Sequence, residues 1–279
     1  MANKKQCGVI SIDDGGHSTC VVTKDVALQF PSVKGLYGTR TLTETSEPYD
    51  FVVEYKERKY VMGTLAKYDC KYPLQMHTKS KCNDFFDLSV LVSIHQYGYA
   101  DNLLITSVPI AYHNDTEKAG RINRLVGAHT IKVNGVEKSF TIRDTKVAPE
   151  TAVAFWLYEP NGKSRFVDLG SRTIGYATTL LDDGNVRFID SESGTIKGKG
   201  LEALDEDYDQ QSLADLICGK LASVWNENDR IHMLGGGAED RRLVEAIQGY
   251  FPNAIVMEEP QMVNAKAMYQ LGMVTYDMV

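Results

Sequence analysis

Two short segments with one shared pattern, far apart in the chain, most constrain what this sequence can fold into. In each, an apolar stretch runs into an aspartate and a glycine, and small or hydroxyl-bearing residues and a second β-rich stretch follow. The segments are Ile12-Asp13-Asp14-Gly15-Gly16 and Phe166-Val167-Asp168-Leu169-Gly170-Ser171-Arg172-Thr173. Apolar runs bounded by turn residues are typical of strands. Each segment therefore predicts a strand, a tight turn and a return strand.

The residues in these turns suit an anion. Glycine lets the backbone N–H groups of a turn approach a phosphate closely, and an aspartate beside it can hold a phosphate-bound Mg²⁺ through water. One Asp-Gly turn is weak evidence because such pairs are common in ordinary turns. Two of them predict a nucleotide clamp with two jaws. The chain has no lysine-bearing phosphate loop of the GxxxxGK[ST] type, so backbone N–H groups and Mg²⁺ must neutralise the phosphates.

Composition limits the class of protein. A chain of 279 residues with 43% hydrophobic and 24% charged residues predicts a globular protein of two linked domains. A net charge of −7 argues against broad, direct nucleic-acid binding, which needs a basic face. The five cysteines are odd in number and form no CxxC pair, which favours reduced thiols in a cytoplasmic protein. We expect neither a membrane span nor a signal peptide.

The predicted elements repeat in the two halves of the chain. The first half is expected to hold strands at 6–12, 19–22 and 101–109, hairpins at 51–63 and 130–142, and helices at 84–97, 115–124 and 150–157. The second half is expected to hold strands at 165–167, 173–181, 185–190, 230–234 and 254–257, and helical regions at 201–225, 238–251 and 262–271. This order predicts a duplicated αβ unit, with an inserted subdomain at about 30–82.

Three further motifs accompany the two turns. Residues 140–151 read as a strand that leads into a helix, residues 234–239 contain Gly235-Gly236-Gly237-Ala238, and residues 263–267 open the last helix. In this order the set resembles the actin-like ATPases, specifically the ParM/StbA plasmid-segregation group. The two turns resemble that group's phosphate loops, residues 234–239 its adenosine motif, and the other two segments its interdomain helices. The resemblance spans residues 9 to about 272.

The resemblance implies an α/β fold of the actin, Hsp70 and sugar kinase superfamily, in which two αβ domains enclose a nucleotide cleft. Domain I would be residues 1–149 with the insertion at about 30–82, and domain II residues 150–262. A helix at 263–279 would return to domain I. The interval between Asp168 and Gly235 is short where the family carries subdomain IIB. Subdomain IIB is therefore expected to be missing or much reduced, as in the short AlfA-type filament proteins.

The resemblance also implies roles for individual residues. Glu150 would polarise the attacking water, and Asp168 would organise metal and water beside the γ-phosphate. Asp13 and Asp168 would hold Mg²⁺ through water. His17 would offer a backbone N–H to phosphate, or act as a catalytic group. The residues expected to contact the nucleotide are Asp13, Asp14, Gly15, Gly16, His17, Asp168, Leu169, Gly170, Ser171, Arg172, Thr173, Gly235, Gly236, Gly237 and Ala238. Ser171 departs from many relatives, which have glycine there.

The function implied by the resemblance is nucleotide-dependent self-assembly into filaments that segregate plasmid copies. ATP or GTP would be hydrolysed with Mg²⁺, and a DNA-binding adaptor at a plasmid centromere would link the acidic filament to DNA. The protein would be cytoplasmic, without a membrane partner. The alternatives are a monomeric kinase or chaperone-type ATPase of the same superfamily, and a scaffold that binds nucleotide without hydrolysing it.

Several features also have structural explanations. Asp13 and Asp14 could be solvated turn residues, and Glu150 could stabilise a helix start through the helix dipole. The three glycines resemble a dinucleotide fingerprint, but Asp240 occupies its third glycine position. The pair Arg241-Arg242 and the acidic stretch 205–209 could be solvated surface or subunit contacts. The tyrosine-rich residues 49–72 could be a polymer contact or an ordinary insertion.

Overall fold

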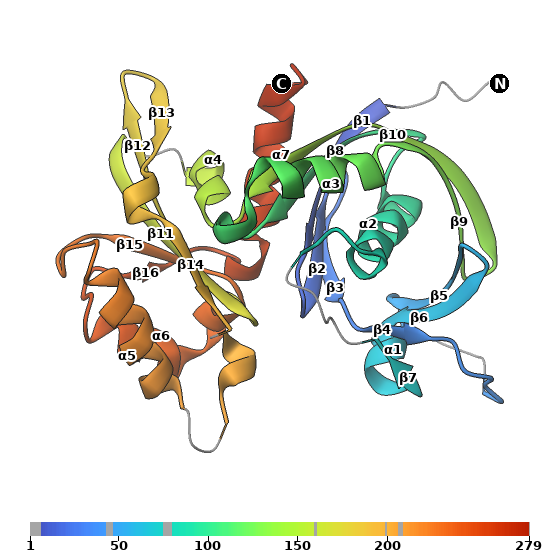
Figure 1. The fold of residues 1–279 in the computed structure, drawn as a ribbon, viewed down its shortest axis with the longest axis horizontal. Helices are drawn as coiled ribbons and strands as arrows, with labels where there is room; N and C mark the ends of the chain where they lie inside the picture. Colours follow the sequence, from blue (N-terminus) through green and yellow to red (C-terminus); the bar gives the residue numbers. More distant parts are fainter. Residues whose placement is uncertain are drawn as a thin grey trace. The chain divides into compact units, whose positions relative to one another are not determined.

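The computed structural model describes residues 7–42, 47–74, 80–158, 161–198, 200–205 and 209–278. The chain divides into two compact units. The first comprises Met1–Ser107, Asn114–Val147 and Gly272–Val279, and the second comprises Val108–His113 and Ala148–Leu271. Within the described residues, each unit is built around one β-sheet with helices packed against it (Figure 1).

The sheet of the first unit has ten strands over the described residues, in the order β3-β2-β1-β8-β10-β9-β5-β6-β4-β7. Strands β1 and β8 pair in parallel, whereas β1–β2, β2–β3, β5–β6 and β9–β10 are antiparallel hairpins. The strands are β1 Cys7–Asp14, β2 Ser18–Val22, β3 Ala27–Pro31, β4 Lys34–Leu36, β5 Asp50–Tyr55, β6 Arg58–Gly63, β7 Tyr72–Pro73, β8 Asp101–Val108, β9 Gly127–Val133 and β10 Val136–Pro149.

Helix α2, Asp84–Tyr97, lies inside the curve of this sheet (Figure 1). The side chain of Asn83 accepts the N–H groups of Phe85 and Phe86 and so caps the helix. Residues 86–95 are buried without a break. A helix buried on all sides needs apolar residues around its whole circumference. The predicted helix over 84–97 is confirmed, and it forms the centre of the apolar core with the strands around it.

The turn between β9 and β10 confirms the predicted hairpin. Asn134 has φ 49° and Gly135 has φ 82°, and positive φ at both central residues is what a type I′ turn requires. The described part of the predicted insertion contains β4 to β7 and helix α1, Thr64–Tyr68. It joins the main sheet because β5 pairs with β9. Helix α3, Asp115–Leu125, follows, with Asn114 as its N-cap.

The sheet of the second unit has the order β13-β12-β11-β15-β16 in the described part of the chain, and β14 also pairs with β12. The pairs β11–β15 and β15–β16 are parallel, and the hairpin β11–β12 is antiparallel. The strands are β11 Gly162–Leu169, β12 Thr173–Asp182, β13 Asn185–Phe188, β14 Gly194–Lys197, β15 Ile231–Leu234 and β16 Ile255–Val256.

Helices α5, Gln210–Leu221, and α6, Arg241–Gln248, pack on each other and bury their apolar faces against this sheet. Asp209 caps α5 by accepting the N–H of Ser212, while residues 206–208 of the predicted acidic stretch lie outside the described residues. The remaining elements are η1 Ile110–Tyr112, η2 Ala152–Ala154, α4 Phe155–Tyr158, η3 Asp190–Glu192, η4 Leu201–Ala203, η5 Gly236–Glu239, η6 Pro260–Met262 and α7 Val263–Thr275.

Two helix predictions are wrong at their starts. The helix expected from Pro149 does not begin there, because strand β10 continues through Pro149 and only the short η2 and α4 follow. The helix expected from Ala238 begins at Arg241, with the Asp240 side chain as its N-cap. Searched over its described residues, the chain has no helix that is both long and apolar enough to cross a membrane.

Candidate functional site

The two Asp-Gly segments form hairpin turns with the same local geometry. In β1–β2, Asp14 is opposite Thr19, and in β11–β12, Leu169 is opposite Ile174. A Cβ atom on Gly15 would lie 2.8 Å from the carbonyl oxygen of Ser18, and one on Gly170 would lie 2.7 Å from that of Thr173. Real Cβ atoms do not approach backbone this closely. Glycine is therefore required at both positions, and the predicted pair of hairpins is confirmed.

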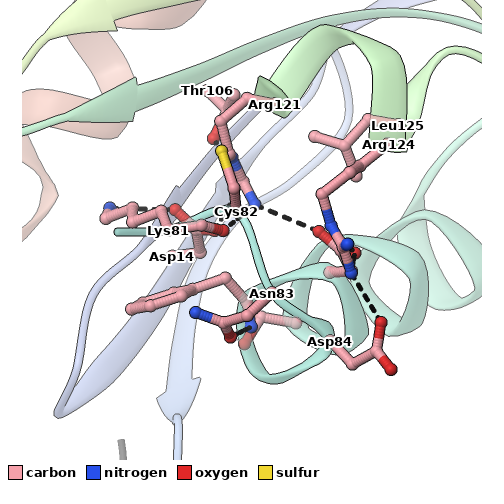
Figure 2. A network of polar contacts seen from close by, with 12 residues as sticks. Asp14, Lys81, Cys82, Asn83, Asp84, Thr106, Arg121, Arg124 and Leu125 are labelled. Carbon is pink, nitrogen blue, oxygen red and sulfur yellow. Dashed lines mark hydrogen bonds and ion pairs between the residues drawn. The ribbon is translucent and has the colours of Figure 1, made fainter. Parts of the chain in front are cut away.

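The first hairpin holds its two aspartates differently. Asp13 is half-buried, and its carboxylate accepts a hydrogen bond from Ser107 Oγ at 3.2 Å. Asp14 is completely buried. Its Oδ2 lies 2.6 Å from Arg121 Nη2 and its Oδ1 lies 2.9 Å from Lys81 Nζ (Figure 2). Asp14 is therefore not the solvated turn residue considered above, and a contact with nucleotide is left to its backbone.

The partners of Asp14 extend into a wider ionic network. Arg121 is completely buried and also contacts Asp87 Oδ1 at 3.2 Å and the Lys81 carbonyl oxygen at 2.9 Å. Arg124 pairs with Asp87 at 2.6 Å. It also pairs with Asp84 at 2.5 Å (Figure 2). Buried charges are stable only when they are paired. The network thus fixes the first loop to α2, α3 and the segment before α2.

A buried lysine stands close to this network. Lys34 Nζ donates to Ser89 Oγ at 2.6 Å and to the Phe85 carbonyl oxygen at 2.7 Å. Burial lowers the pKa of Lys34 to about 7, and the charge of Asp14 opposes this shift. Burial also raises the pKa of Asp87. The signal that could have revealed the network is Asp87 itself, a carboxylate flanked by the apolar residues Phe86 and Leu88 in a helix with a largely apolar centre.

The turn of the second hairpin is held by backbone hydrogen bonds from residues 201 and 202. The Gly170 carbonyl accepts the N–H of Leu201 at 3.1 Å, and the Ser171 carbonyl accepts the N–H of Glu202 at 2.8 Å. The loop therefore rests on η4. Leu169 is completely buried in the apolar core of the unit. It occupies the place in the second loop that Asp14 occupies in the first.

Residues 234–239 pack directly on the second hairpin. Gly235 has φ 83°, and a Cβ there would lie 2.3 Å from Asp168 Oδ1. A Cβ on Gly237 would lie 2.7 Å from Leu169 Cβ. Close backbone approach thus explains these two glycines. Gly236 has more room, because a Cβ there would lie 3.9 Å from its nearest neighbour, Leu201 Cδ1.

The remaining predicted contacts differ in exposure. Ala238 is buried, Gly16 is half-buried and His17 is exposed. Arg172 is half-buried and lies 3.8 Å from Glu202. Arg241 is almost fully exposed and pairs with Glu245 within its own helix, which fits the explanation of a solvated helix face.

Glu150 lies in a tight turn and not in a helix. Its N–H donates to the Val108 carbonyl at 2.9 Å, and its own carbonyl accepts the N–H of Ala152 at 2.7 Å. The intervening Thr151 has φ 68° and ψ −56°. A hydrogen bond between residues two apart across a positive φ defines a rare, strained γ-turn. Because Glu150 does not lie in a helix, the explanation that it stabilises a helix start through the helix dipole does not apply.

Asn264 connects this turn to the second hairpin. Its Oδ1 accepts the N–H of Thr151 at 3.1 Å, and its Nδ2 donates to Asp168 Oδ2 at 2.7 Å. Asp168, Gly235 and the Glu150 turn are thereby joined within the second unit. Sequence reasoning did not single out Asn264 as a site residue, since a single asparagine near a helix start has no distinctive pattern.

No group of three or more His, Cys, Asp or Glu side chains among the described residues could hold a metal ion directly. A magnesium ion held through water by single carboxylates needs no such cluster, because Mg²⁺ usually keeps several of its waters. The donor chemistry of Asp13 and Asp168 fits that mode.

Each of the two hairpins thus has a glycine that its neighbours require, and a glycine motif packs on the second hairpin. The family model described as "Actin like proteins N terminal domain" matches residues 11–152. The chain belongs to this family. No curated protein matches the sequence.

Solved structures agree on the fold. A 15-stranded ParM filament from Clostridium botulinum has 17% identity and a TM-score of 0.79, and covers 96% of this chain and 99% of its own. An AlfA filament bound to AMPPNP has 20% identity and a TM-score of 0.73, and covers 98% of both chains. The archaeal actin homolog Ta0583 in complex with ADP has 15% identity and a TM-score of 0.73, and covers 96% of this chain and 99% of its own. The predicted actin-like fold is confirmed.

Proposed function

We propose that this protein binds and hydrolyses ATP or GTP with Mg²⁺ and assembles into filaments that segregate plasmid copies. The observation that carries the proposal is the pair of hairpins in which Gly15 and Gly170 make the same forced approach to a carbonyl, in a chain of the actin-like family. Similar solved structures include a ParM filament, an AlfA filament bound to AMPPNP and an archaeal actin homolog in complex with ADP. These support a nucleotide-binding, self-assembling protein.

Each part of the site has a proposed role. The turns at 15–17 and 170–173 present backbone N–H groups to the phosphates, and residues 235–238 contact the adenosine. Asp13 and Asp168 would hold Mg²⁺ through water. That ion would neutralise phosphate charge, as it does in most phosphoryl-transfer sites. Glu150 orients and polarises the attacking water with its negative charge.

The proposed domains follow the resemblance to the actin-like ATPases. Domain I is residues 1–149, domain II is 150–262, and the segment 263–279 returns to domain I. Between Asp168 and Gly235, the described residues form β12, β13, β14, α5, β15 and two short 3₁₀ turns. We propose that subdomain IIB is missing or much reduced, which would leave the nucleotide base with fewer contacts.

Self-association and an adaptor complete the proposal. The net charge of −7 disfavours direct contact with DNA, so a DNA-binding adaptor would join the filament to the plasmid. The bound γ-phosphate and Mg²⁺ would favour the assembled form, and their loss would remove that bias. A nucleotide-binding scaffold without turnover would share the assembly but not the hydrolysis.

The test combines sedimentation, electron microscopy and phosphate release. The purified protein is incubated with Mg²⁺ and ATP, GTP or a non-hydrolysable analogue of each. Filaments that pellet above a critical concentration, together with phosphate release, are expected. Filaments without phosphate release would favour the scaffold. A protein that stays monomeric with every nucleotide over a wide salt range would exclude the filament function.

A further inference from the structure

The side chain of Asn264 bridges Asp168 and the turn that carries Glu150, the two carboxylates that the proposed reaction uses. It contacts Asp168 directly at 2.7 Å, and it contacts the turn of Glu150 through the N–H of Thr151 at 3.1 Å. Asn264 is 6% exposed. A buried polar group is costly unless its hydrogen bonds are made, and here the carbonyl and the amino end of one amide are both used.

The geometry fixes which way this amide points. The Thr151 N–H is a donor and so must meet the amide oxygen, which turns the amino group towards Asp168. A neutral donor at this place leaves the Asp168 carboxylate its negative charge, whereas an arginine or lysine would neutralise it. Asparagine is thus suited to orient Asp168 without weakening its attraction for a hydrated cation.

The Thr151 turn needs such support because it is strained. A β-branched residue with φ 68° is a backbone outlier, and it persists only where the surroundings impose it. Thr151 is buried, and its Oγ1 lies 1.9 Å from where a Cβ on Gly175 would stand. Gly175 faces Asp168 in the β11–β12 register. The strained turn is therefore packed against the same hairpin to which Asn264 binds.

We propose that Asn264 is a positioning residue for nucleotide hydrolysis, one that holds the Asp168 carboxylate and the Glu150 turn in one fixed arrangement. This inference rests on the proposed function. Asn264 touches neither nucleotide nor water in this role; it acts through Asp168 and through Thr151. If the bound nucleotide and metal shift the Asp168 side chain, the Asn264 amide would shift with it and move the turn that carries Glu150.

The test uses Asn264→Asp and Asn264→Ser in the full-length protein, with Asn253→Asp as the matched control. Asn253 is exposed, and its amide donates to a backbone carbonyl at 2.8 Å. Asn264→Asp keeps an acceptor for Thr151 but sets a second carboxylate against Asp168. Two carboxylates at this distance share a proton, and the higher pKa of the pair rises. Circular dichroism establishes that each variant is folded.

The expected result for Asn264→Asp is a phosphate-release rate at least about ten-fold lower at neutral pH. The acid limb of its pH–rate profile for phosphate release should move to higher pH by about one unit or more, because Asp168 must be ionised to act. Asn264→Ser removes the donor to the Asp168 carboxylate, so it should lower the rate and move the acid limb in the same direction by a smaller amount. In both nucleotide-free variants, hydrogen exchange at the Thr151 amide should change, and for Asn264→Ser it should rise at least about ten-fold. Asn253→Asp should match the wild type.

Two outcomes separate this inference from the proposed function. If the wild type releases phosphate and a folded Asn264→Asp or Asn264→Ser protein keeps the wild-type rate, acid limb and Thr151 exchange, Asn264 has no positioning role. The proposed function would stand. If the wild type releases no phosphate from ATP or GTP, the proposed hydrolysis is wrong, and this inference falls with it.

Discussion

Replacing Arg121 by methionine tests whether the buried network anchors the loop of the first hairpin, the predicted first phosphate loop. Methionine keeps much of the length and apolar volume of arginine but carries neither charge nor donors. The change leaves Asp14 and Asp87 without the guanidinium that lies 2.6 Å from one and 3.2 Å from the other. Lys81 still contacts Asp14 at 2.9 Å, so Asp14 keeps one cation and loses the completely buried one.

The magnitude follows from burial. Arg121 and Asp14 side chains are both 0% exposed, so water cannot replace the lost contact. Removing one partner of a buried ion pair typically costs about 3–5 kcal/mol. With a urea dependence of about 3 kcal/mol per M, the unfolding midpoint should fall by roughly 1 M or more. The double variant Asp14→Leu with Arg121→Met should cost less than the sum of the single changes, because it removes both charges and copies the apolar Leu169 of the second loop.

Urea unfolding of the nucleotide-free protein measures these costs, and Arg241→Met is the matched control. Arg241 pairs with Glu245 at 2.7 Å, but its side chain is 89% exposed. Its removal should leave the midpoint unchanged, since exposed pairs contribute little. Nucleotide affinity, measured in parallel, should fall for Arg121→Met only. An Arg121→Met protein with the wild-type midpoint and affinity would refute the argument that this network holds the loop.

Four further predictions concern single side chains. Asp168→Ala should lower phosphate release by about 100-fold with the fold intact by circular dichroism, and near-normal turnover would contradict its role. Glu150→Gln keeps the shape but not the charge, so nucleotide should still bind while release slows and filaments persist after dilution; unchanged release would remove Glu150 from the mechanism. The folded-state pKa of Lys34 is lowered to about 7 from 10.5, so the unfolded chain binds more protons above pH 7, and stability rises with pH. Lys34→Met should therefore be more stable than the wild type at pH 7, and this advantage should shrink by up to about 1.4 kcal/mol per pH unit towards pH 8.5. Urea titration at the two pH values measures the difference in free energy of unfolding, and a difference that does not change with pH would contradict the lowered pKa. Gly175→Ala should lower the melting temperature strongly, because the new Cβ meets a side chain at 1.9 Å, whereas Gly219→Ala in helix α5 meets nothing within 4 Å and should not; equal effects would contradict the packing.

The parts of the fold that could be predicted from the sequence are those set by local residue patterns. Strand-turn-strand spacing and the Asn134-Gly135 pair depend on the backbone conformations that a few residues allow, so these hairpins could be predicted. The start at Pro149 could not, because a proline followed by an acid fits a helix start as well as a strand end. The hydrogen bond from Glu150 to Val108 decides between them, and that partner is distant in the chain.

The site shows the same division. Gly15, Gly170 and Asp168 belong to a local strand-turn-strand pattern that predicts phosphate binding. Asn264 and Arg121 belong to no such pattern, because the contacts that make them important come from residues on other elements. Asp14 illustrates the limit: its position in the turn was evident, but the direction of its side chain depends on Lys81 and Arg121, which the chain supplies far downstream.

The unlike residues behind the two loops give them unlike responses to temperature. Leu169 is held by apolar contacts, and that stabilisation weakens on cooling. Asp14 is held by ion pairs, whose desolvation penalty falls as temperature rises. Both anchors weaken on cooling, because cold reduces apolar stabilisation and raises the desolvation penalty of the ion pairs. On heating, apolar stabilisation levels off while that penalty continues to fall, so heat favours the ionic anchor of the first loop over the apolar anchor of the second. The two loops of one protein therefore differ most in their stability at high temperature.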